Sequence, residues 1–203
     1  MWKFFKKLFV VLLIAAAFFG GTLIRDKKTL KDDIIRLHVV ADSDSEADQT
    51  VKLQVRDAIL AEMEQILATA ENKRDAFILL AQSLDDLQDT ANEVLTALGV
   101  EDTAVVTLDE EAFPTRVYDT FSLPAGVYGS LRVTIGSGEG KNWWCVVFPR
   151  LCVPAASEEV EDVAAGAGFS DALSGSLTGE KPYQIRFFIL DCLGKLENFF
   201  RKG

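Results

Sequence analysis

The chain has 203 residues, of which 49% are apolar and 26% are charged, a composition typical of one globular domain with a hydrophobic core. A second full domain is not expected at this length. The net charge of −10 at pH 7 argues against nucleic acid and anionic lipid surfaces as partners of the protein's body. We expect any protein partner to be neutral or basic where it makes contact.

The N-terminus has the layout of an export signal. Three lysines precede twelve uncharged apolar residues, Leu8 to Phe19. We therefore interpret residues 1–21 as a signal peptide or an N-terminal membrane anchor. The apolar stretch can also be taken as residues 8–24, and these seventeen residues are at the lower limit for crossing a bilayer. Membrane attachment through this stretch stays open.

Residues 22–33 are polar and charged, and we expect them to form a short tether. Residues 34–41 then alternate with the period of a strand. One face of this strand would carry Ile35, Leu37, Val39 and Ala41, and the other face would carry Arg36 and His38. Ser45 and Asp48 follow with the spacing of a capping box, which predicts the start of a helix.

Two amphipathic helices are expected next. Their apolar stripes are Val51, Val55, Ile59, Met63 and Ile66 in the first helix, and Phe77, Leu80, Leu84, Leu87, Ala91, Val94 and Leu98 in the second. Gly99 is well placed as the left-handed residue that closes the second helix.

Strand-like stretches follow the helices, at residues 103–109, 114–123, 127–135 and 142–148. The run from Gly136 to Gly140 supplies the positive φ angles of a turn between the last two stretches, so we expect an antiparallel hairpin there. The predicted fold is α+β, with two amphipathic helices packed on a mostly antiparallel sheet and an export signal in front.

The last quarter of the chain has a different composition. Residues 154–182 are rich in Ala, Gly, Ser and Glu, which predicts a flexible segment with at most one short helix. Residues 183–203 are expected to form a C-terminal strand and an amphipathic helix. The apolar residues of that helix would be Leu193, Leu196, Phe199 and Phe200.

The sequence shows little that indicates catalysis, a metal or a cofactor. His38 is the only histidine, which excludes a multi-histidine metal site, and we expect it to be structural. Asp42, Asp44 and Asp48 lack the glycine and the bidentate glutamate of a calcium loop, so helix capping accounts for them. Neither a phosphate-binding loop nor a serine-nucleophile motif is present. We therefore predict no catalytic residues, no metal and no cofactor.

The cysteines allow two interpretations. Cys145 and Cys152 lie close together in a chain predicted to be exported, so a disulfide between them is the default expectation. The alternative is a reactive thiol at Cys145 with His38 as its base, which would define an exported thiol-dependent enzyme. Cys192 lies in an apolar segment, where we expect a buried free thiol.

Two of the three tryptophans, Trp143 and Trp144, are adjacent. Neighbouring residues on a strand point to opposite faces, so one indole can enter the core while the other faces solvent or a partner. An exposed Trp next to Asn142 and Arg150 has the composition of an interface hot spot.

Several blocks in order along the chain resemble the stage II sporulation protein R family of endospore-forming bacteria. The blocks are Ile35 to Ser45, Asp48-Gln49, Lys52 to Ala58, Phe113 to Arg116, Leu123 to Tyr128, Leu131 to Val133, Ile135-Gly136, and Gly140 to Cys152. The combination of Asn-Trp-Trp-Cys with Phe-Pro-x-Leu-Cys is specific. The resemblance covers a core domain at residues 34–153.

The resemblance implies an exported signalling protein rather than an enzyme. Members are secreted across the forespore membrane into the space between the two membranes, where they trigger a membrane-embedded aspartic protease of the mother cell. That protease processes the precursor of the early mother-cell sigma factor. We expect the contact residues to be Asn142, Trp143, Trp144, Phe148, Arg116 and Tyr128. A membrane-anchored structural component of the septum is a further alternative.

Overall fold

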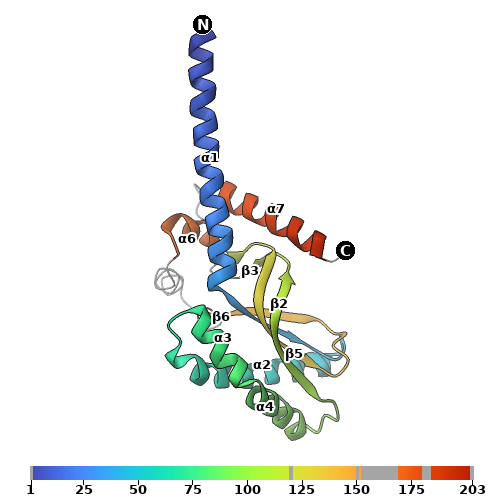
Figure 1. The fold of residues 1–203 in the computed structure, drawn as a ribbon. Helices are drawn as coiled ribbons and strands as arrows, with labels where there is room; N and C mark the ends of the chain where they lie inside the picture. The colour runs from blue at the N-terminus through green and yellow to red at the C-terminus, as the bar shows by residue number, and fades with distance from the viewer. Residues whose placement is uncertain (1, 119–120, 150, 152–168, 180–183, 202–203) are drawn as a thin grey trace.

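The computed structural model describes residues 2–118, 121–149, 151, 169–179 and 184–201. Figure 1 shows the arrangement of the elements. In chain order they are α1 (Trp2–Asp33), β1 (Ile35–Val40), α2 (Glu46–Ile66), a short 3-10 helix (Leu67–Thr69), α3 (Lys73–Gln82), α4 (Leu84–Ala97), β2 (Ala104–Phe113), β3 (Arg116–Val117), β4 (Ser122–Leu123), β5 (Gly126–Ile135), β6 (Asn142–Phe148), α6 (Asp171–Thr178) and α7 (Gln184–Arg201).

Helix α1 begins as a stalk that projects from the domain (Figure 1). It is the one helix among the described residues that is long and apolar enough to cross a membrane. Its second half packs on the domain, where Leu23, Asp26 and Leu30 are buried. Residues 22–33, predicted to form a tether, are therefore a helical part of the fold. The sequence-based expectation missed this because the buried apolar residues are only two among many charged ones.

The main sheet has the strand order β2-β5-β1-β6. Strand β1 runs parallel to β5 and antiparallel to β6, and β5 runs antiparallel to β2. The α+β class is confirmed, but the sheet is mixed and not mostly antiparallel. Strands β3 and β4 pair separately as a small antiparallel ribbon.

The predicted hairpin between β5 and β6 is wrong because β1 lies between these two strands. The glycine-rich turn carries the chain across the end of β1, where the Gly140 amide donates to the Ala41 carbonyl at 2.9 Å. A Cβ atom at Gly140 would collide with the Ser43 carbonyl. Gly136 and Gly138 have φ values of 55° and 66°, as expected for the turn. Turn chemistry alone does not reveal which strand the turn crosses.

One face of the sheet is covered by α2, α3 and α4 (Figure 1). Their apolar stripes pack on Leu37, Val39, Leu131 and other side chains of that face to form the first core cluster. Ser45 caps α2, and its hydroxyl accepts a hydrogen bond from the Asp48 amide, which confirms the predicted start. The predicted second helix divides into α3 and α4 at Ser83.

The other face is partly covered by α1, α6 and α7, which build a second core cluster around Ile34, Phe113 and Tyr128. The predicted C-terminal strand is wrong, because residues 184–201 form one helix. The run from Phe187 to Leu190 is apolar at every position, and such a run fits a helix as well as a strand. Within residues 154–182, the described residues hold the single short helix α6, and residues 154–168 and 180–182 lie outside the described residues.

Candidate functional site

The site lies on the face of the sheet opposite α2, α3 and α4, which we call the second face. Strand β1 directs its polar side chains to this face, away from the three helices. Arg36 and His38 are both buried there, although the alternating pattern predicts a polar strand face. Beyond α1 and α7 this face opens toward solvent, and Asn142 is exposed at its edge. Strand β1 is central in the sheet, and for this reason its polar side chains are enclosed by neighbours from β5, β2 and β6.

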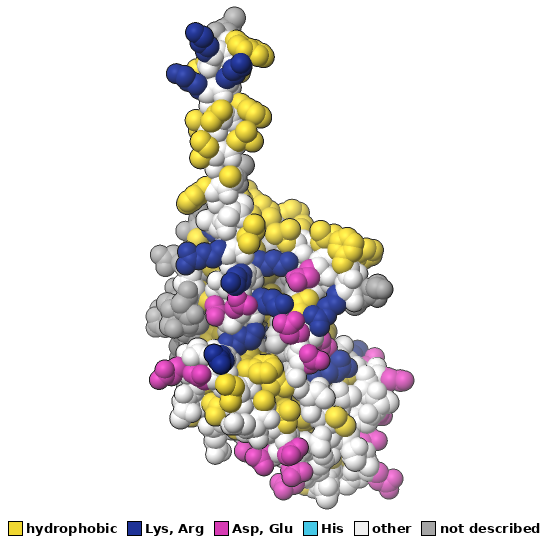
Figure 2. Space-filling view, viewed as in Figure 1, with side chains coloured by type: hydrophobic (Ala, Val, Ile, Leu, Met, Phe, Trp, Pro, Cys, Tyr) yellow, Lys and Arg dark blue, Asp and Glu magenta, His cyan; other side chains and the backbone are white. Residues whose placement is uncertain are grey.

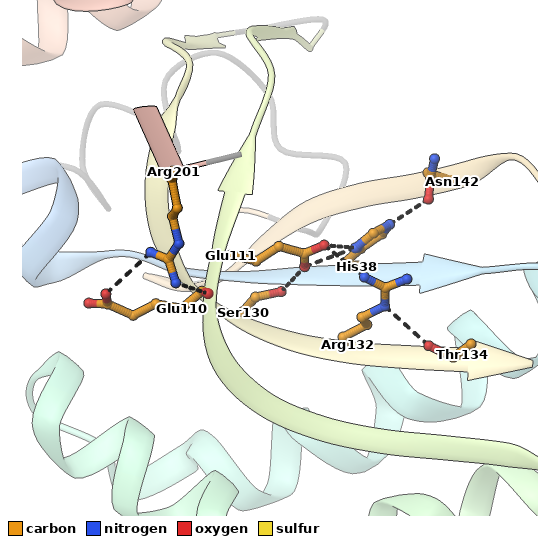
Figure 3. A network of polar contacts seen from close by, with 8 residues as sticks. All are labelled: His38, Glu110, Glu111, Ser130, Arg132, Thr134, Asn142 and Arg201. Carbon is orange, nitrogen blue, oxygen red and sulfur yellow. Dashed lines mark hydrogen bonds and ion pairs between the residues drawn. The ribbon is translucent and has the colours of Figure 1, made fainter. Parts of the chain in front are cut away.

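His38 is the centre of a polar network (Figure 3). Its Nδ1 lies 2.9 Å from Glu111 Oε1, and its Nε2 lies 2.6 Å from Asn142 Oδ1. The Glu111 carboxylate also accepts hydrogen bonds from Ser130 Oγ at 2.9 Å and from Arg132 Nη1 at 3.1 Å. The network joins four strands of the main sheet, since its members come from β1, β2, β5 and β6.

Glu111 is the charged group that this network stabilises. Burial by itself would raise the pKa of its carboxyl. The hydrogen bond and charge of His38, the hydrogen bond from Ser130 and the charge of Arg132 outweigh burial, so the pKa lies below its ordinary value. An ionised Glu111 therefore holds the ring of His38 in a fixed orientation.

The imidazole of His38 stacks on the indole of Trp144, with ring centroids 5.4 Å apart. The guanidinium of Arg116 lies over the same indole, 3.5 Å from its centroid. Trp144 and Arg116 are both half-buried. The arrangement leaves a rigid, partly exposed surface of aromatic and cationic groups next to Asn142.

Arg36 lies beneath this surface and is fully buried. Its guanidinium lies 4.1 Å from the ring centroid of Phe113 and 5.2 Å from that of Tyr128, and it donates to the Tyr118 hydroxyl at 2.9 Å. Its Nε and Nη1 atoms have no hydrogen-bond partner among the described residues. A buried arginine ordinarily pairs with a carboxylate. Arg36 instead contacts two aromatic ring faces and one hydroxyl group.

The six predicted contact residues do not form one patch. Asn142, Trp144 and Arg116 lie together on the second face. Trp143 and Phe148 are half-buried against the first core cluster, on the side of the three helices, and Arg56 covers the Trp143 ring at 4.9 Å. The two indoles therefore point to opposite faces, as their adjacency on a strand predicts.

Tyr128 is the predicted contact residue that lies in the interior. Only 3% of it is exposed, and its hydroxyl donates to the Pro124 carbonyl at 2.8 Å. Burial raises the pKa of this hydroxyl. Tyr128 therefore supports the site through Arg36 and cannot touch a partner in this conformation.

The sequence-based reasoning missed Glu111, Ser130 and Arg132 as site residues, and it considered His38 only as a structural residue or as the base of a Cys145 thiol. The sequence does contain a pattern that points to polar site residues, because Arg36 and His38 share one face of a strand and Ser130 and Arg132 share one face of another. Strands β1 and β5 pair in parallel with His38 opposite Arg132, and this register brings the two polar sets together. The register depends on the crossover through α2 to α4, which local patterns do not fix.

The thiol-enzyme alternative conflicts with the strand register. Cys145 pairs with Leu37, so its side chain belongs to the face opposite His38. A base on one face of a sheet cannot activate a thiol on the other. Cys152 lies outside the described residues, so its pairing with Cys145 stays a prediction.

Cys192 is exposed, which corrects the expectation of a buried thiol. Cys192 lies on the outer side of α7, whereas Leu190 on the inner side is buried in the second core cluster. Among the described residues, no group of His, Cys, Asp and Glu side chains could hold a metal ion.

The fold and the site together define an α+β domain that is carried on an N-terminal apolar helix and presents a polar, aromatic surface on one sheet face. The chain belongs to the stage II sporulation protein R family, whose model matches residues 31–158. This membership supports a role in sporulation.

A relative in Bacillus subtilis (strain 168), stage II sporulation protein R, is 35% identical over 123 residues. The match covers 61% of this chain and 55% of the relative, so the chain spans about half of that protein's length. No solved structure matches the chain.

Proposed function

We propose that this chain is an exported signalling protein of endospore formation that activates a membrane-embedded aspartic protease, which then processes the precursor of the early mother-cell sigma factor. The observation that carries the proposal is the family match over residues 31–158, which contains strands β1 to β6 and every residue of the site. The apolar stretch of α1 is compatible with secretion across the forespore membrane into the intermembrane space.

The partner-binding surface in this proposal is the exposed part of the second sheet face, with Trp144, Arg116 and Asn142 at its centre. A half-buried Trp covered by an Arg is the composition of an interface hot spot. His38 and Glu111 hold Trp144 and Asn142 in place from below. A preorganised surface loses little conformational freedom when a partner binds.

Activation in this scheme is a shift of the protease from an inactive to an active state. A ligand shifts such an equilibrium only by binding the active state more tightly, and a difference of about 5.5 kcal/mol takes a two-state system from 1:99 to 99:1. The free energy comes from the contact itself, so the proposal requires no catalytic group in this chain.

The test is co-expression of the full chain, the protease and the sigma-factor precursor in a host that does not sporulate. The expected result is a shortened sigma factor on an immunoblot only when all three proteins are present. Omitting the protease controls for processing by the host. Precursor processing that proceeds without this chain would refute the activator proposal.

One observation favours the alternative of a membrane-anchored component of the septum. Leu23 and Leu30 of α1 are buried in the second core cluster, so the stretch that follows the apolar segment is built into the domain. The mass of the intact protein from membrane and soluble fractions separates the two functions. A soluble species that lacks residues 1–21 and still activates the protease would eliminate the structural alternative.

A further inference from the structure

Helix α7 exposes a continuous apolar stripe. Ile185, Phe188, Cys192, Leu196 and Phe199 follow one another at spacings of three and four, so they share one side of the helix. Phe188 is 66% exposed and Phe199 is 73% exposed. Contiguous exposed apolar surface of this kind marks a site of contact with a protein or a membrane.

The orientation of α7 is fixed by its opposite side. The Asp191 carboxylate accepts hydrogen bonds from the Ala125 amide at 2.8 Å and from the Thr115 hydroxyl. Gly194 lies so close to the Ala125 carbonyl that a Cβ atom would overlap it. The helix therefore docks through Asp191 and Gly194, and it cannot roll to bury its apolar stripe without losing these contacts.

Helix α7 is also held at a defined height along α1. Arg186 pairs with Asp26, and Lys27 pairs with Glu197 at 2.9 Å. Asp26 lies two residues after Ile24, the last apolar residue of the stretch, which corresponds to about 3 Å along a helix axis. The first turn of α7 therefore lies level with the end of the segment that is able to span a bilayer.

No tether separates that segment from the domain, because residues 22–33 are helical and partly buried. A bilayer crossed by α1 would consequently meet the surface of the domain that carries α7. Figure 2 shows the apolar side chains of α7 next to the stalk, with Lys and Arg side chains gathered where the stalk joins the domain. Acidic side chains lie among these basic ones and also at the far end of the domain, where no basic side chains accompany them in this view and the expected repulsion from anionic lipid applies.

We propose that α7 is a second membrane contact, with its apolar stripe lying in the interfacial layer of the same bilayer that α1 crosses. The occupant of the stripe is lipid, because the apolar part of α1 and the basic residues that follow it in the same helix, Arg25, Lys27 and Lys28, fit the apolar and headgroup layers of one membrane. The contact fixes the tilt of the domain on the membrane. It does not depend on protease activation.

The test uses the full chain reconstituted in vesicles of phosphatidylcholine and phosphatidylglycerol, with an environment-sensitive fluorophore attached to the exposed thiol of Cys192. The expected result is emission shifted to shorter wavelength, together with quenching by lipids that carry a nitroxide near the glycerol backbone. Quenching by a nitroxide at the end of the acyl chain should be weaker, because interfacial helices enter only about 5–10 Å.

Two variants provide the matched controls for the label position. Cys192→Ser gives the background from any other labelled thiol. Cys192→Ser with Asp89→Cys moves the fluorophore to the exposed surface of α4, on the other side of the sheet. Emission at position 89 should equal that of the probe in water, with no quenching by either lipid.

A second set of variants tests the stripe itself. Phe188→Gln, Leu196→Gln and Phe199→Gln together should abolish the spectral shift at Cys192, and the exposed positions of these residues keep the fold intact. Val105→Gln, an exposed apolar residue on β2, should leave the shift unchanged.

Emission at Cys192 equal to that at position 89 would overturn the proposal. A shift without lipid quenching, accompanied by energy transfer between labelled chains, would also overturn it, because a second copy would then cover α7. Neither outcome bears on sigma-factor processing, so failure of the membrane contact and failure of the activator proposal are distinguishable.

Discussion

The guanidinium of Arg116 lies 3.5 Å from the centroid of the Trp144 indole. Trp is the strongest aromatic partner for a cation, and a planar guanidinium can stack flat on it. Burial lowers the pKa of Arg116, and the positive charge of Arg36 adds to this effect, whereas Tyr118 opposes it. Arg116 nevertheless stays charged at physiological pH, because an arginine does not deprotonate in proteins. The pair is thus a fixed cationic and aromatic feature at the centre of the proposed contact.

Replacing Trp144 with Ala should weaken binding to the protease by about 2 kcal/mol or more, which is roughly 30-fold in affinity. Sigma-factor processing in the co-expression host measures the loss, and circular dichroism checks that the variant folds. Arg116→Lys should also lower processing, because an ammonium group does not reproduce a stacked guanidinium.

Trp143→Ala is the matched control for Trp144→Ala. Its indole packs on the first core cluster, so this substitution should reduce stability more than processing. If Trp143→Ala and Trp144→Ala both fold and both support normal processing, neither indole belongs to the contact surface.

Arg36 gives a prediction about stability. Its buried charge has no carboxylate partner among the described residues, and the desolvation of an ion costs several kcal/mol. The cation–π contacts with Phe113 and Tyr128 offset this cost by about 2 kcal/mol of stabilisation. Arg36→Met keeps most of the side-chain volume without the charge, so it should unfold at the same or a higher denaturant concentration.

Arg36→Ala is the comparison that isolates volume from charge. It should be about 2–5 kcal/mol less stable than Arg36→Met, because it leaves a cavity between two aromatic rings. Equal destabilisation by Met and by Ala in urea unfolding would show that the charge itself holds this region together. Loss of processing in a stable Arg36→Met protein would assign Arg36 a role in positioning the site above it.

Local patterns predicted those parts of the fold that depend on local interactions. The cap at Ser45, the apolar stripe of α2 and the left-handed Gly99 follow from residues within one or two turns of each other. The opposite directions of Trp143 and Trp144 follow from strand alternation. Each of these predictions needs no knowledge of which strands are neighbours.

The errors that affect the site and the outer surface of α7 concern long-range arrangement. Strand β1 inserts between β5 and β6, and this placement turns the expected polar face at Arg36 and His38 into an interior one. Helix α7 turns its apolar stripe outward because Asp191 and Gly194 make the closer fit to the sheet. Hydrophobic periodicity shows that a helix has two sides, but it does not show which side the fold buries.

Glu111 should make stability depend on pH. Its pKa in the folded protein lies below the value of about 4.3 for an unfolded chain. Its contribution is therefore fully present above the unfolded value and is lost as the pH falls through the folded value. Urea unfolding in detergent between pH 7 and about pH 3 should show stability falling with acidity.

Glu111→Gln should be less stable than the wild type at neutral pH and should show a flatter decline in acid. Glu110→Gln removes the same charge from the neighbouring position on β2, which is more exposed, so it controls for net charge. A Glu111→Gln protein with the wild-type stability at both ends of the range would contradict the central place of this carboxylate in the network.

Gly194 tests whether α7 is held as the structure shows. A Cβ atom at this position would overlap the Ala125 carbonyl, so Gly194→Ala must push the helix away from the sheet. Displacement of a packed element typically costs about 1–3 kcal/mol. It would also lengthen the hydrogen bond from the Ala125 amide to Asp191. Amide hydrogen exchange across residues 184–201 should become faster, while exchange in α2 and β1 stays as in the wild type.

Gly21→Ala is the control for Gly194→Ala, because the space around Gly21 in α1 is open. It adds the same methyl group without a collision, so exchange in α7 should not change. If Gly194→Ala leaves that exchange unchanged as well, α7 does not dock through this glycine. The outward direction of its apolar stripe, on which the second membrane contact depends, would then lose its structural basis.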